Sequence, residues 1–359
     1  MKNFNTVRPQ LILDEFRCKR NIQRMTQKAT KLKIKLRPHF KTHQSLEVGR
    51  WFREAGIKGI TVSSVDMASY FASDGWDDIT IAFPFYPLQI PALCKLEKKA
   101  SLRLFVNRTE DLELISKNLH RPFKVILEID PGFGRSGIHY QNHNLIEDLI
   151  QTCDRLDNCS FYGFYTHDGR TYQSTGIDQI RSSIMPVIGI LTDLKRSFPQ
   201  ASLLMGDTPS TSVLNDFGPI DELSPGNFVF YDWMQVQIGS CNIDDVALFC
   251  SVPVAQVIGD GSAAIVHGGA VHLSKDSLVI NGNRCFGQVI NYSEKIITVE
   301  ANSYLSALSQ EHGTVNTNQP KLFENETLWI CPIHSCLTAN LHDHYLTTTG
   351  KIIDKRILS

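Results

Sequence analysis

The sequence predicts an α/β fold: a closed (β/α)8 TIM-type barrel followed by a C-terminal, mainly-β domain. Short apolar, β-branched segments alternate with helix-like segments from about residue 15 to residue 230, which is typical of eight-stranded parallel barrels. After residue 240, strand-like segments follow one another across Gly, Asn and Asp turns without a strong helix. A doubly wound open sheet is the alternative, but no glycine-rich dinucleotide turn follows the first strand.

The elements are expected in the following order. The barrel strands are Ile34–Phe40, Ile60–Ser64, Ile79–Phe83, Leu102–Val106, Lys124–Asp130, Phe161–Thr166, Leu203–Asp207 and Glu222–Val229. The helices between them are Leu46–Ala55, Asp66–Ser73, Pro91–Lys98, Asp111–Leu119, Asn144–Cys153 and Ile177–Ser197. The later strands are Val246–Val257, Ala263–Val266, Phe286–Ile290, Lys295–Val299 and Leu328–Ile333. We therefore expect a barrel over residues 15–240 and a β domain over residues 241–359, which residues 1–14 join through the strand-like Gln10–Leu13.

Composition excludes several classes of protein. The 359 residues suffice for a barrel and a second domain, and 42% hydrophobic with 20% charged residues is an ordinary globular balance. The net charge of −1, without a run of Lys or Arg, argues against nucleic acid or an anionic membrane as partner. No apolar run reaches the roughly 18 residues that span a bilayer. The first residues lack the apolar core of a signal peptide, and nine scattered cysteines indicate reduced thiols and a cytoplasmic location.

The stretch Leu36–His43 (Leu-Arg-Pro-His-Phe-Lys-Thr-His) places Lys41 where the first strand ends and a loop begins. A lysine held against a barrel mouth and shielded from water can lose its proton and form a Schiff base. Taken alone, Lys41 is better explained as a surface lysine. If it does form a Schiff base, the chain is a pyridoxal-phosphate (PLP) enzyme.

Other polar residues follow the carboxyl ends of the expected strands, where barrels carry their catalytic groups. Hydroxyls and backbone N–H groups after the last two strands commonly bind phosphate. The segments are Asp130–Gly137 with Arg135, His167–Tyr172, Asp207–Ser210 with Thr208, and Ser224–Asn227 with Gly226.

Each of these residues also has a structural interpretation. Arg135 could pair with Asp130 or close a turn. His167 on an alternating strand could be a hydrogen-bonded structural histidine, and Thr208 and Ser210 could be helix caps. Their occurrence at one rim favours the functional interpretation.

The segments resemble the D-serine dehydratase and D-threonine aldolase group of alanine-racemase-like (fold type III) PLP enzymes, over essentially the whole chain. The segments that carry the resemblance are Arg37–His43, Gly132–Gly137, Tyr165–His167, Gly206–Ser210 and Ser224–Asp232. The resemblance implies that Lys41 carries PLP, that Arg135 lies near its phenolic oxygen and His167 beside its ring, and that a homodimer forms. We predict Lys41, His167 and Arg135 as catalytic residues. The predicted cofactor-binding residues are Lys41, Arg135, His167, Tyr172, Thr208, Ser210, Gly226, Asn227 and Tyr231.

A histidine and a cysteine stand two residues apart in Pro332–Leu337. If this segment is a strand, His334 and Cys336 leave the same face, and imidazole with thiolate suits zinc. The resemblance implies that these two bind the metal, zinc or else manganese. It also favours a dehydratase, because aldolases of the group more often carry an acidic residue at the cysteine position. His342 and His344 form a second possible ligand cluster.

The predicted activity is a PLP- and metal-dependent lyase that converts D-serine or D-threonine to a 2-oxo acid and ammonia. A D-threonine aldolase, an amino-acid racemase and a non-catalytic PLP-binding protein remain alternatives. Two departures from alanine racemases argue against racemisation. Ser224 replaces the arginine that faces the pyridine nitrogen, and the segment His267–Asp276 lacks the tyrosine base. His267 and His272 could be structural, and the Leu308–Gly313 segment, with Glu311 and His312, has no assigned role.

Overall fold

The computed structural model describes residues 7–357, which divide into two compact units. The barrel unit comprises residues 23–226, and the β unit comprises the described residues 7–22 and 227–357. The predicted β domain, 241–359 with 1–14, includes residues 1–6 and 358–359, which lie outside the described part of the chain. The N-terminal residues that lacked a signal-peptide core lie there too.

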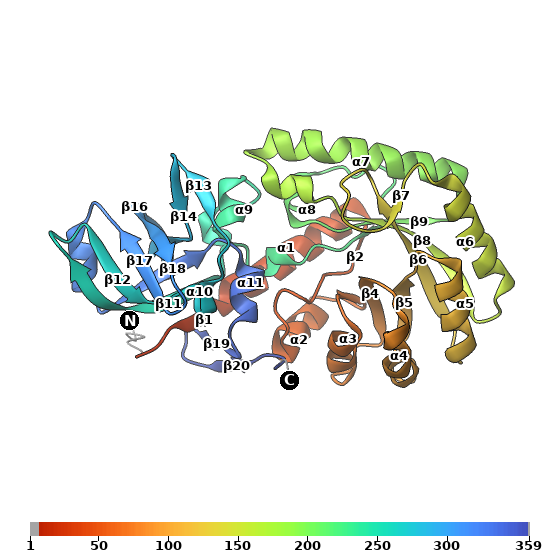
Figure 1. The fold of residues 1–359 in the computed structure, drawn as a ribbon, viewed down its shortest axis with the longest axis horizontal. Coiled ribbons are helices and arrows are strands. Elements are labelled where there is room, and N and C mark those ends of the chain that lie inside the picture. Colours follow the sequence, from red (N-terminus) through yellow and green to blue (C-terminus); the bar gives the residue numbers. More distant parts are fainter. Residues whose placement is uncertain (1–6, 358–359) are drawn as a thin grey trace. The chain divides into compact units, whose positions relative to one another are not determined.

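Parallel strands form the barrel unit, and they confirm the predicted (β/α)8 architecture (Figure 1). A bridge between His39 and Thr61 joins the two ends of the strand order. Within residues 23–226 eight strands follow that order: β2 (Lys35–Leu36), β10 (Glu222–Leu223), β9 (Ser202–Met205), β8 (Cys159–Thr166), β6 (Phe123–Asp130), β5 (Ser101–Phe105), β4 (Asp78–Pro84) and β3 (Ile60–Val62).

The first and last barrel strands are shorter than predicted. The prediction had them as Ile34–Phe40 and Glu222–Val229, but β2 ends at Leu36 and β10 at Leu223. The chains still run side by side, because His39 N–H donates to Pro225 O at 2.9 Å. Pro38 and Pro225 lack the N–H group that a regular ladder needs. The segments around Lys41 and Gly226 are therefore irregular backbone.

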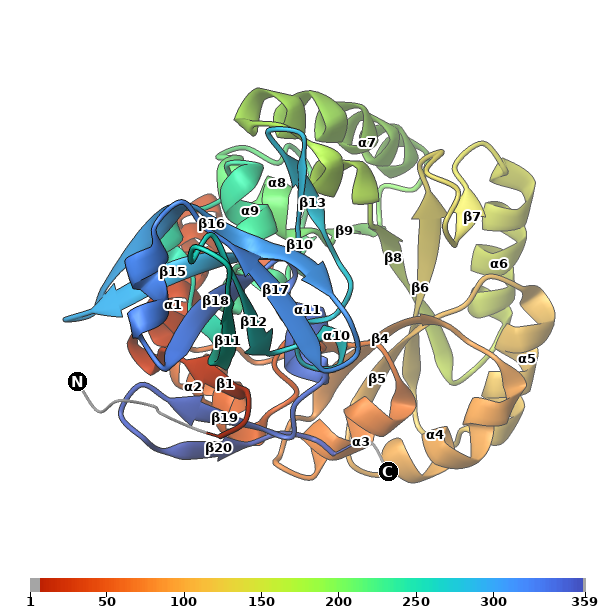
Figure 2. The ribbon, with the colours of Figure 1, turned by 60° about the vertical axis from the view of Figure 1, so that its left-hand side comes forward.

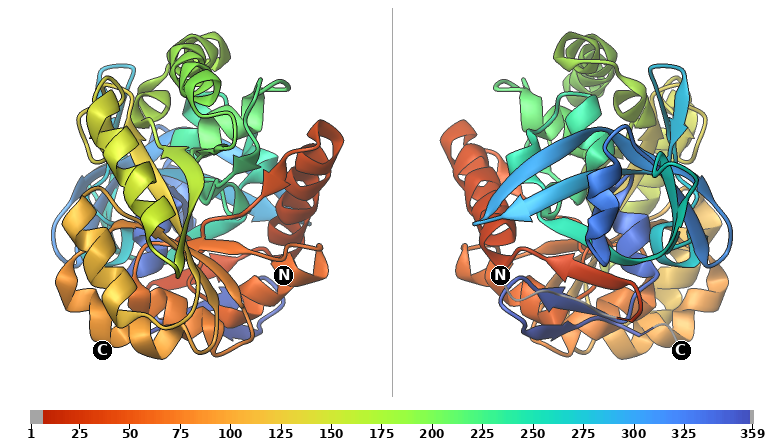
Figure 3. Two further views of the ribbon diagram at one scale, coloured as in Figure 1. Left: turned by 90° about the vertical axis from the view of Figure 1, so that its right-hand side faces the viewer. Right: turned by 90° about the vertical axis from the view of Figure 1, so that its left-hand side faces the viewer.

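Helices lie between the strands and on the outside of the barrel unit (Figures 1 and 3). The expected helices all form, within a few residues of their predicted bounds. Side-chain caps define two of the starts: Ser64 accepts from Met67 N–H at 3.1 Å, and Asn142 accepts from Leu145 N–H. The helices are α2 (Leu46–Glu54), α3 (Val65–Ala72), α4 (Ile90–Leu96), α5 (Thr109–Asn118), α6 (His143–Arg155), α7 (Ile177–Ser197) and α8 (Thr208–Val213). Helix α1 (Glu15–Leu32) begins within the residues of the β unit and ends within those of the barrel unit.

A buried ion-pair network lies near the amino ends of β4 and β10. Arg37 reaches Asp78 at 2.5 Å and Glu222 at 3.0 Å, and Arg103 reaches Glu222 at 3.1 Å. The charged side chains near the amino ends of these strands are therefore paired with one another. Reactive groups are left to the carboxyl ends of the strands, as is usual in this architecture.

A closed antiparallel barrel forms the β unit, with β1, β19 and β20 extending its sheet from β11 (Figure 2). Strand β12 alternates half-buried and buried residues, which is the pattern of a strand with one face on a core. Val252, Val266, Leu305 and Val315 belong to that core. The strands are β1 (Gln10–Leu13), β11 (Leu248–Ile258), β12 (Ala263–His267), β15 (Gly287–Ser293), β16 (Ile296–Leu308), β17 (His312–Asn316), β18 (Thr327–Pro332), β19 (His344–Thr347) and β20 (Ile352–Asp354), beside the hairpin β13 (Leu278–Ile280) and β14 (Asn283–Cys285).

Short helices interrupt the β unit, among them α9 (Trp233–Gln237), α10 (Ala270–Leu273) and α11 (Ser335–Asn340). They carry or adjoin several of the candidate ligands described below. Of the helices within residues 7–357, none is both long and apolar enough to cross a membrane.

Candidate active site

Lys41 lies directly after the bridge that closes the barrel, and its side chain is exposed. Burial by the protein therefore does not shield it from water, contrary to the expectation from its apolar neighbours. Its backbone N–H donates to Nδ1 of the buried His39 at 3.3 Å. Burial and then the positive charge of Lys41 hold the pKa of His39 well below its usual range. His39 is thus a neutral neighbour of Lys41 that sequence reasoning had only noted as flanking.

His167 follows β8 and is held by the backbone carbonyl of Gly206, to which its Nδ1–H donates. Burial, and after it the positive charge of Arg135, lowers the pKa of His167 to about 4. The ring is therefore neutral, with its proton on Nδ1 and its lone pair on Nε2. The hydrogen bond gives His167 the anchoring of a structural histidine while it leaves Nε2 with a lone pair to offer.

Arg135 lies in a loop that Asp130 organises. One oxygen of Asp130 accepts from the backbone N–H groups of Gly132, Phe133 and Gly134 at 2.8 to 3.0 Å. Arg135 itself is half exposed and lies 3.9 Å from Glu128. The alternative that Arg135 pairs with Asp130 is therefore wrong in this structure: Asp130 shapes the loop, and the guanidinium is open to solvent.

The predicted phosphate rim is built around Asp207, which sequence reasoning had not singled out. Asp207 caps α8: it accepts from Ser210 N–H at 2.7 Å and from Ser210 Oγ–H at 2.5 Å. Thr208 and Ser210 are therefore not the caps of this helix. Burial raises the pKa of Asp207 to about 6. An acidic residue directly before Thr-Pro-Ser was the available signal, because Asp is a preferred N-cap.

Two features of the rim fit a phosphate-bearing cofactor. The hydroxyl Oγ1 of the fully buried Thr208 has no hydrogen-bond partner among the described residues, and such a group is costly unless a ligand satisfies it. Its backbone N–H donates to Tyr172 Oη at 3.2 Å. At Gly226, a Cβ would lie 2.9 Å from Thr42 Oγ1 and 3.0 Å from His39 O. Glycine therefore keeps the backbone close to the segment that carries Lys41.

Ser224 does not extend toward the rim, because its hydroxyl donates to Thr61 Oγ1 at 2.8 Å. Ser224 is buried. At the position where alanine racemases carry an arginine, this chain therefore has a short hydroxyl that already has a hydrogen-bond partner.

In the β unit, His334 and Cys336 do not lie on one strand, which corrects the geometry expected from their spacing. Strand β18 ends at Pro332, His334 precedes α11, and Cys336 lies in the first turn of that helix. The two side chains still meet. Burial by itself lowers the pKa of His334, but hydrogen bonds to Asp276 and Cys336 outweigh it and raise that pKa to about 11.

Asp276 contacts His334 Nδ1 at 3.0 Å, although 58 residues separate the two. A carboxylate on one nitrogen of a metal-binding imidazole fixes the ring and its tautomer. The donor set of imidazole and thiolate, with this support, fits a divalent metal such as zinc. Sequence reasoning missed Asp276 because nothing local links it to His334.

Asn227 and Tyr231 both lie in the β unit. The amide Nδ2 of Asn227 donates to Asp232 at 2.6 Å and to Ser335 Oγ at 3.0 Å, and lies 3.7 Å from Cys336 Sγ. Its side chain is thus engaged beside α11, so its predicted contact with phosphate remains a prediction for its backbone. Tyr231 is nearly buried and has a positive φ of 49°, and its predicted contact with the cofactor also remains a prediction.

His342 and His344 do not assemble a second metal cluster. His342 Nε2 donates to His272 O at 2.9 Å, and burial lowers the pKa of His342 to about 4. Among the described residues, the group of three or more side chains that could hold a metal is instead His267, His272 and Glu311.

Comparison with known proteins defines the class of this fold and site. Residues 13–230 match the alanine racemase N-terminal domain, and residues 247–348 match a putative serine dehydratase domain. The chain therefore belongs to the alanine racemase N-terminal domain family of fold type III PLP-dependent enzymes, as the sequence motifs predicted.

Within this class the chain is similar to dehydratases. It is 24% identical to D-serine dehydratase of Dictyostelium discoideum, over 93% of this chain and 91% of that protein. It is 28% identical to D-threo-3-hydroxyaspartate dehydratase of Delftia sp. strain HT23, over 92% and 91%. The solved structure of that enzyme superposes with a TM-score of 0.87 at 25% identity and covers 98% of each chain. A cysteine-to-alanine variant of it has been solved in a metal-free form.

Aldolases are similar as well. 3-Hydroxy-D-aspartate aldolase of Paracoccus denitrificans is 24% identical over 96% of this chain and 89% of that protein. Dehydratases and aldolases of this kind are PLP-dependent lyases, and the chain is an enzyme of that type. The alternative of a non-catalytic PLP-binding protein finds no support among these relatives.

Proposed function

We propose that this enzyme is a dehydratase of D-β-hydroxy amino acids that uses a divalent metal. D-serine would lose water across Cα and Cβ, and the resulting enamine would take up water and release ammonia, so that the products are pyruvate and ammonia. The observation that carries this choice is the His334–Cys336 pair supported by Asp276. It offers a metal ligand set that a racemase does not need.

The barrel residues would bind and orient the cofactor. Bound PLP supplies an electron sink for the Cα carbanion, and a bound divalent metal supplies a Lewis acid for the departing hydroxyl. Thr208 Oγ1 would donate to a phosphate oxygen, and this contact would satisfy the partnerless hydroxyl. Arg135, whose guanidinium is half exposed, would face the cofactor's anionic oxygen, as the family resemblance implies.

Lys41 would carry the cofactor and, once released from it, remove the Cα proton. Its exposure supports this role, because the amine is accessible to an incoming amino acid. His167 would lie beside the ring as a neutral imidazole. Nε2 of such an imidazole accepts a hydrogen bond and adds no positive charge. The neutral His39 next to Lys41 would likewise leave the proton transfer to the lysine.

Zinc is the metal we propose, since thiolate and imidazole ligands favour it over the harder manganese. We further propose a homodimer, which rests on the family resemblance. A cytoplasmic location rests on the nine scattered cysteines of the sequence. Metal analysis of the purified holoenzyme tests for zinc, and light scattering on the same sample tests for the homodimer.

A product analysis tests the function. The zinc-loaded holoenzyme is incubated with D-serine, D-threonine and D-threo-3-hydroxyaspartate, and with the corresponding L-isomers as controls. We expect a 2-oxo acid and ammonia in equal amounts from the D-isomers. Glycine with an aldehyde would establish the aldolase alternative, the opposite enantiomer would establish a racemase, and absence of all products would overturn the proposal.

A further inference from the structure

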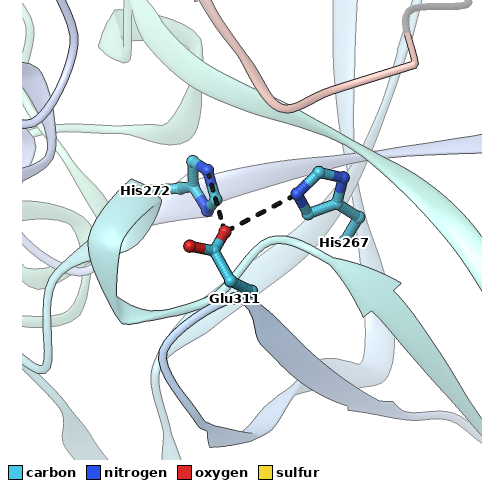
Figure 4. Close-up of side chains that lie close together, drawn as sticks. All are labelled: His267, His272 and Glu311. Carbon is cyan, nitrogen blue, oxygen red and sulfur yellow. Dashed lines mark ion pairs between the residues drawn. The ribbon is translucent and has the colours of Figure 1, made fainter.

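Three ligand-type side chains outside the predicted site converge on one point of the β unit (Figure 4). His267 ends β12, His272 lies in α10, and Glu311 lies in the turn between β16 and β17. The Nε2 atoms of both histidines lie 3.7 Å from the same carboxylate oxygen, Glu311 Oε2. The three ligand atoms all lie within 4.8 Å of one another.

Backbone hydrogen bonds hold the two segments together independently of any ligand. Gly268 N–H donates to Glu311 O at 3.0 Å, and Ala270 N–H donates to Ser309 O at 2.9 Å. A Cβ at Gly269 would lie 2.3 Å from Gln310 O, so only glycine lets the chains approach this closely. The β12–β17 register, with Val266 opposite Gly313, continues this contact. The three side chains are therefore brought together by the fold.

The distances between the two histidine Nε2 atoms and Glu311 Oε2 suit a bridging cation better than direct hydrogen bonds. A distance of 3.7 Å is longer than the hydrogen bonds that imidazole and carboxylate form, about 2.7–3.2 Å. Ligand atoms at about 2.0–2.1 Å from a tetrahedral zinc ion are separated by about 3.4 Å. The two histidine–carboxylate separations thus need to close by only a few tenths of an ångström, which small side-chain rotations supply.

We propose that His267, His272 and Glu311 form a second divalent-cation site, distinct from His334 and Cys336, with a two-imidazole, one-carboxylate ligand set for zinc or the neighbouring transition metals. A fourth position remains for water, as in open zinc sites. All three side chains are partly solvent-accessible, at 40%, 19% and 49%, so a metal ion can enter from solution. The site goes beyond the proposed dehydratase activity and does not depend on it.

One local change accompanies binding. Gly269 N–H donates to His272 Nδ1 at 3.3 Å, and an imidazole bound through Nε2 carries its proton on Nδ1. This long hydrogen bond is therefore lost when the metal binds. The hydrogen bond from His342 to the carbonyl of His272 remains, and it keeps α10 in place.

Metal stoichiometry tests the proposal. The holoenzyme and its variants are equilibrated with Zn²⁺, dialysed and analysed for bound metal. We expect two equivalents per chain in the unmodified enzyme, one in Glu311→Gln, one in Cys336→Ala and none in the double variant. His312→Ala is the matched control, because His312 is exposed next to Glu311 but outside the cluster, and it should retain two.

Cobalt distinguishes the two sites spectroscopically. Co²⁺ at the Cys336 site gives a sulfur-to-metal charge-transfer band, whereas Co²⁺ at the His267 site gives only ligand-field bands. The Cys336→Ala holoenzyme should therefore bind one Co²⁺ without the charge-transfer band, and adding Glu311→Gln should abolish that binding. The proposal is overturned if Cys336→Ala binds no metal, or if Glu311→Gln leaves the stoichiometry unchanged. A dehydratase assay that fails would not alter either outcome.

Discussion

His167 of the barrel unit and His334 of the β unit lie in opposite electrostatic settings. In the barrel unit, burial and the positive charges of Arg135 and Lys41 lower the pKa of His167 to about 4. In the β unit, hydrogen bonds to Asp276 and Cys336 overcome burial and raise the pKa of His334 to about 11. The imidazole is therefore neutral at His167 and a cation at His334 when no ligand is bound.

This difference matches the groups that each unit is proposed to bind. His167 and His39 add no charge of their own, and the positive charges of Arg135 and Lys41 suit an anionic phosphate and phenolate. An imidazole next to a thiol and a carboxylate lies among groups that become anionic ligands, and a divalent cation can replace the proton there. The charges around His167 therefore favour an anionic ligand, and those around His334 favour a cationic ligand.

The largest expected effect is that of Lys41→Ala, which removes the reactive amine from the barrel unit. Turnover should fall by about 10³-fold or more, because general-base and nucleophilic assistance are both lost. The visible absorbance of bound PLP should shift or disappear, while the metal content stays unchanged. Lys58→Ala, at another exposed lysine, is the control. An unchanged cofactor spectrum in Lys41→Ala would contradict the assignment.

Cys336→Ala removes the thiolate from the β side. The enzyme should lose one equivalent of metal and about 10²-fold or more in turnover, because Lewis-acid assistance is worth several kcal/mol. The absorbance of bound PLP should persist, since the barrel residues are intact. Cys94→Ala, in α4, should change neither quantity. Full activity of Cys336→Ala after chelation would rule out the metal role.

Asp276→Asn tests the β unit more finely, because asparagine keeps the shape of the side chain and removes its negative charge. Metal affinity should fall about 10- to 100-fold, the usual cost of losing a carboxylate that orients a histidine ligand. Competition with a chelator of known affinity measures it. Equal affinities in the variant and the parent enzyme would mean that Asp276 does not orient His334.

Asp207→Asn probes the pH dependence of the barrel side. Asp207 has a raised pKa of about 6, so the folded state holds a proton that the unfolded chain has already released. The stability this contributes is complete below about pH 4 and is lost as pH rises through about 6, by at most about 3 kcal/mol. Asparagine keeps the cap and does not titrate. Urea unfolding at pH 4 and pH 7 should therefore show a smaller decrease with pH in the variant, and parallel profiles would refute the assignment.

Thr208→Val gives the smallest expected effect. Losing one hydrogen bond to the charged phosphate, about 1.5 kcal/mol, should weaken PLP binding about tenfold. The stability of the cofactor-free enzyme should not decrease, because the hydroxyl has no hydrogen-bond partner within residues 7–357. Thr211→Val is the contrast: its hydroxyl donates to Asp207 O at 2.6 Å, so it should lower stability. Unfolding of the two apo variants, with PLP titration, separates these results.

Strand ends explain why the barrel side could be predicted well. In a parallel barrel every carboxyl end reaches the same rim, so locating the strands was enough to bring Arg135, His167 and Thr208 into consideration. The prediction from the sequence is wrong where the backbone leaves regular geometry. Pro332 ends β18, so the alternation expected for His334 and Cys336 gives way to a helix start.

The amino-acid sequence by itself determined the fold class, the lysine motif, the rim residues and the histidine–cysteine pair, because each depends on local periodicity or on short spacings. Only the tertiary structure decided what surrounds them: Asp276 on His334, the exposure of Lys41, and the convergence of His267, His272 and Glu311. Those contacts join residues far apart in the chain or depend on the path of irregular backbone. Burial and nearby charge, which set each pKa, exist only once the chain has folded.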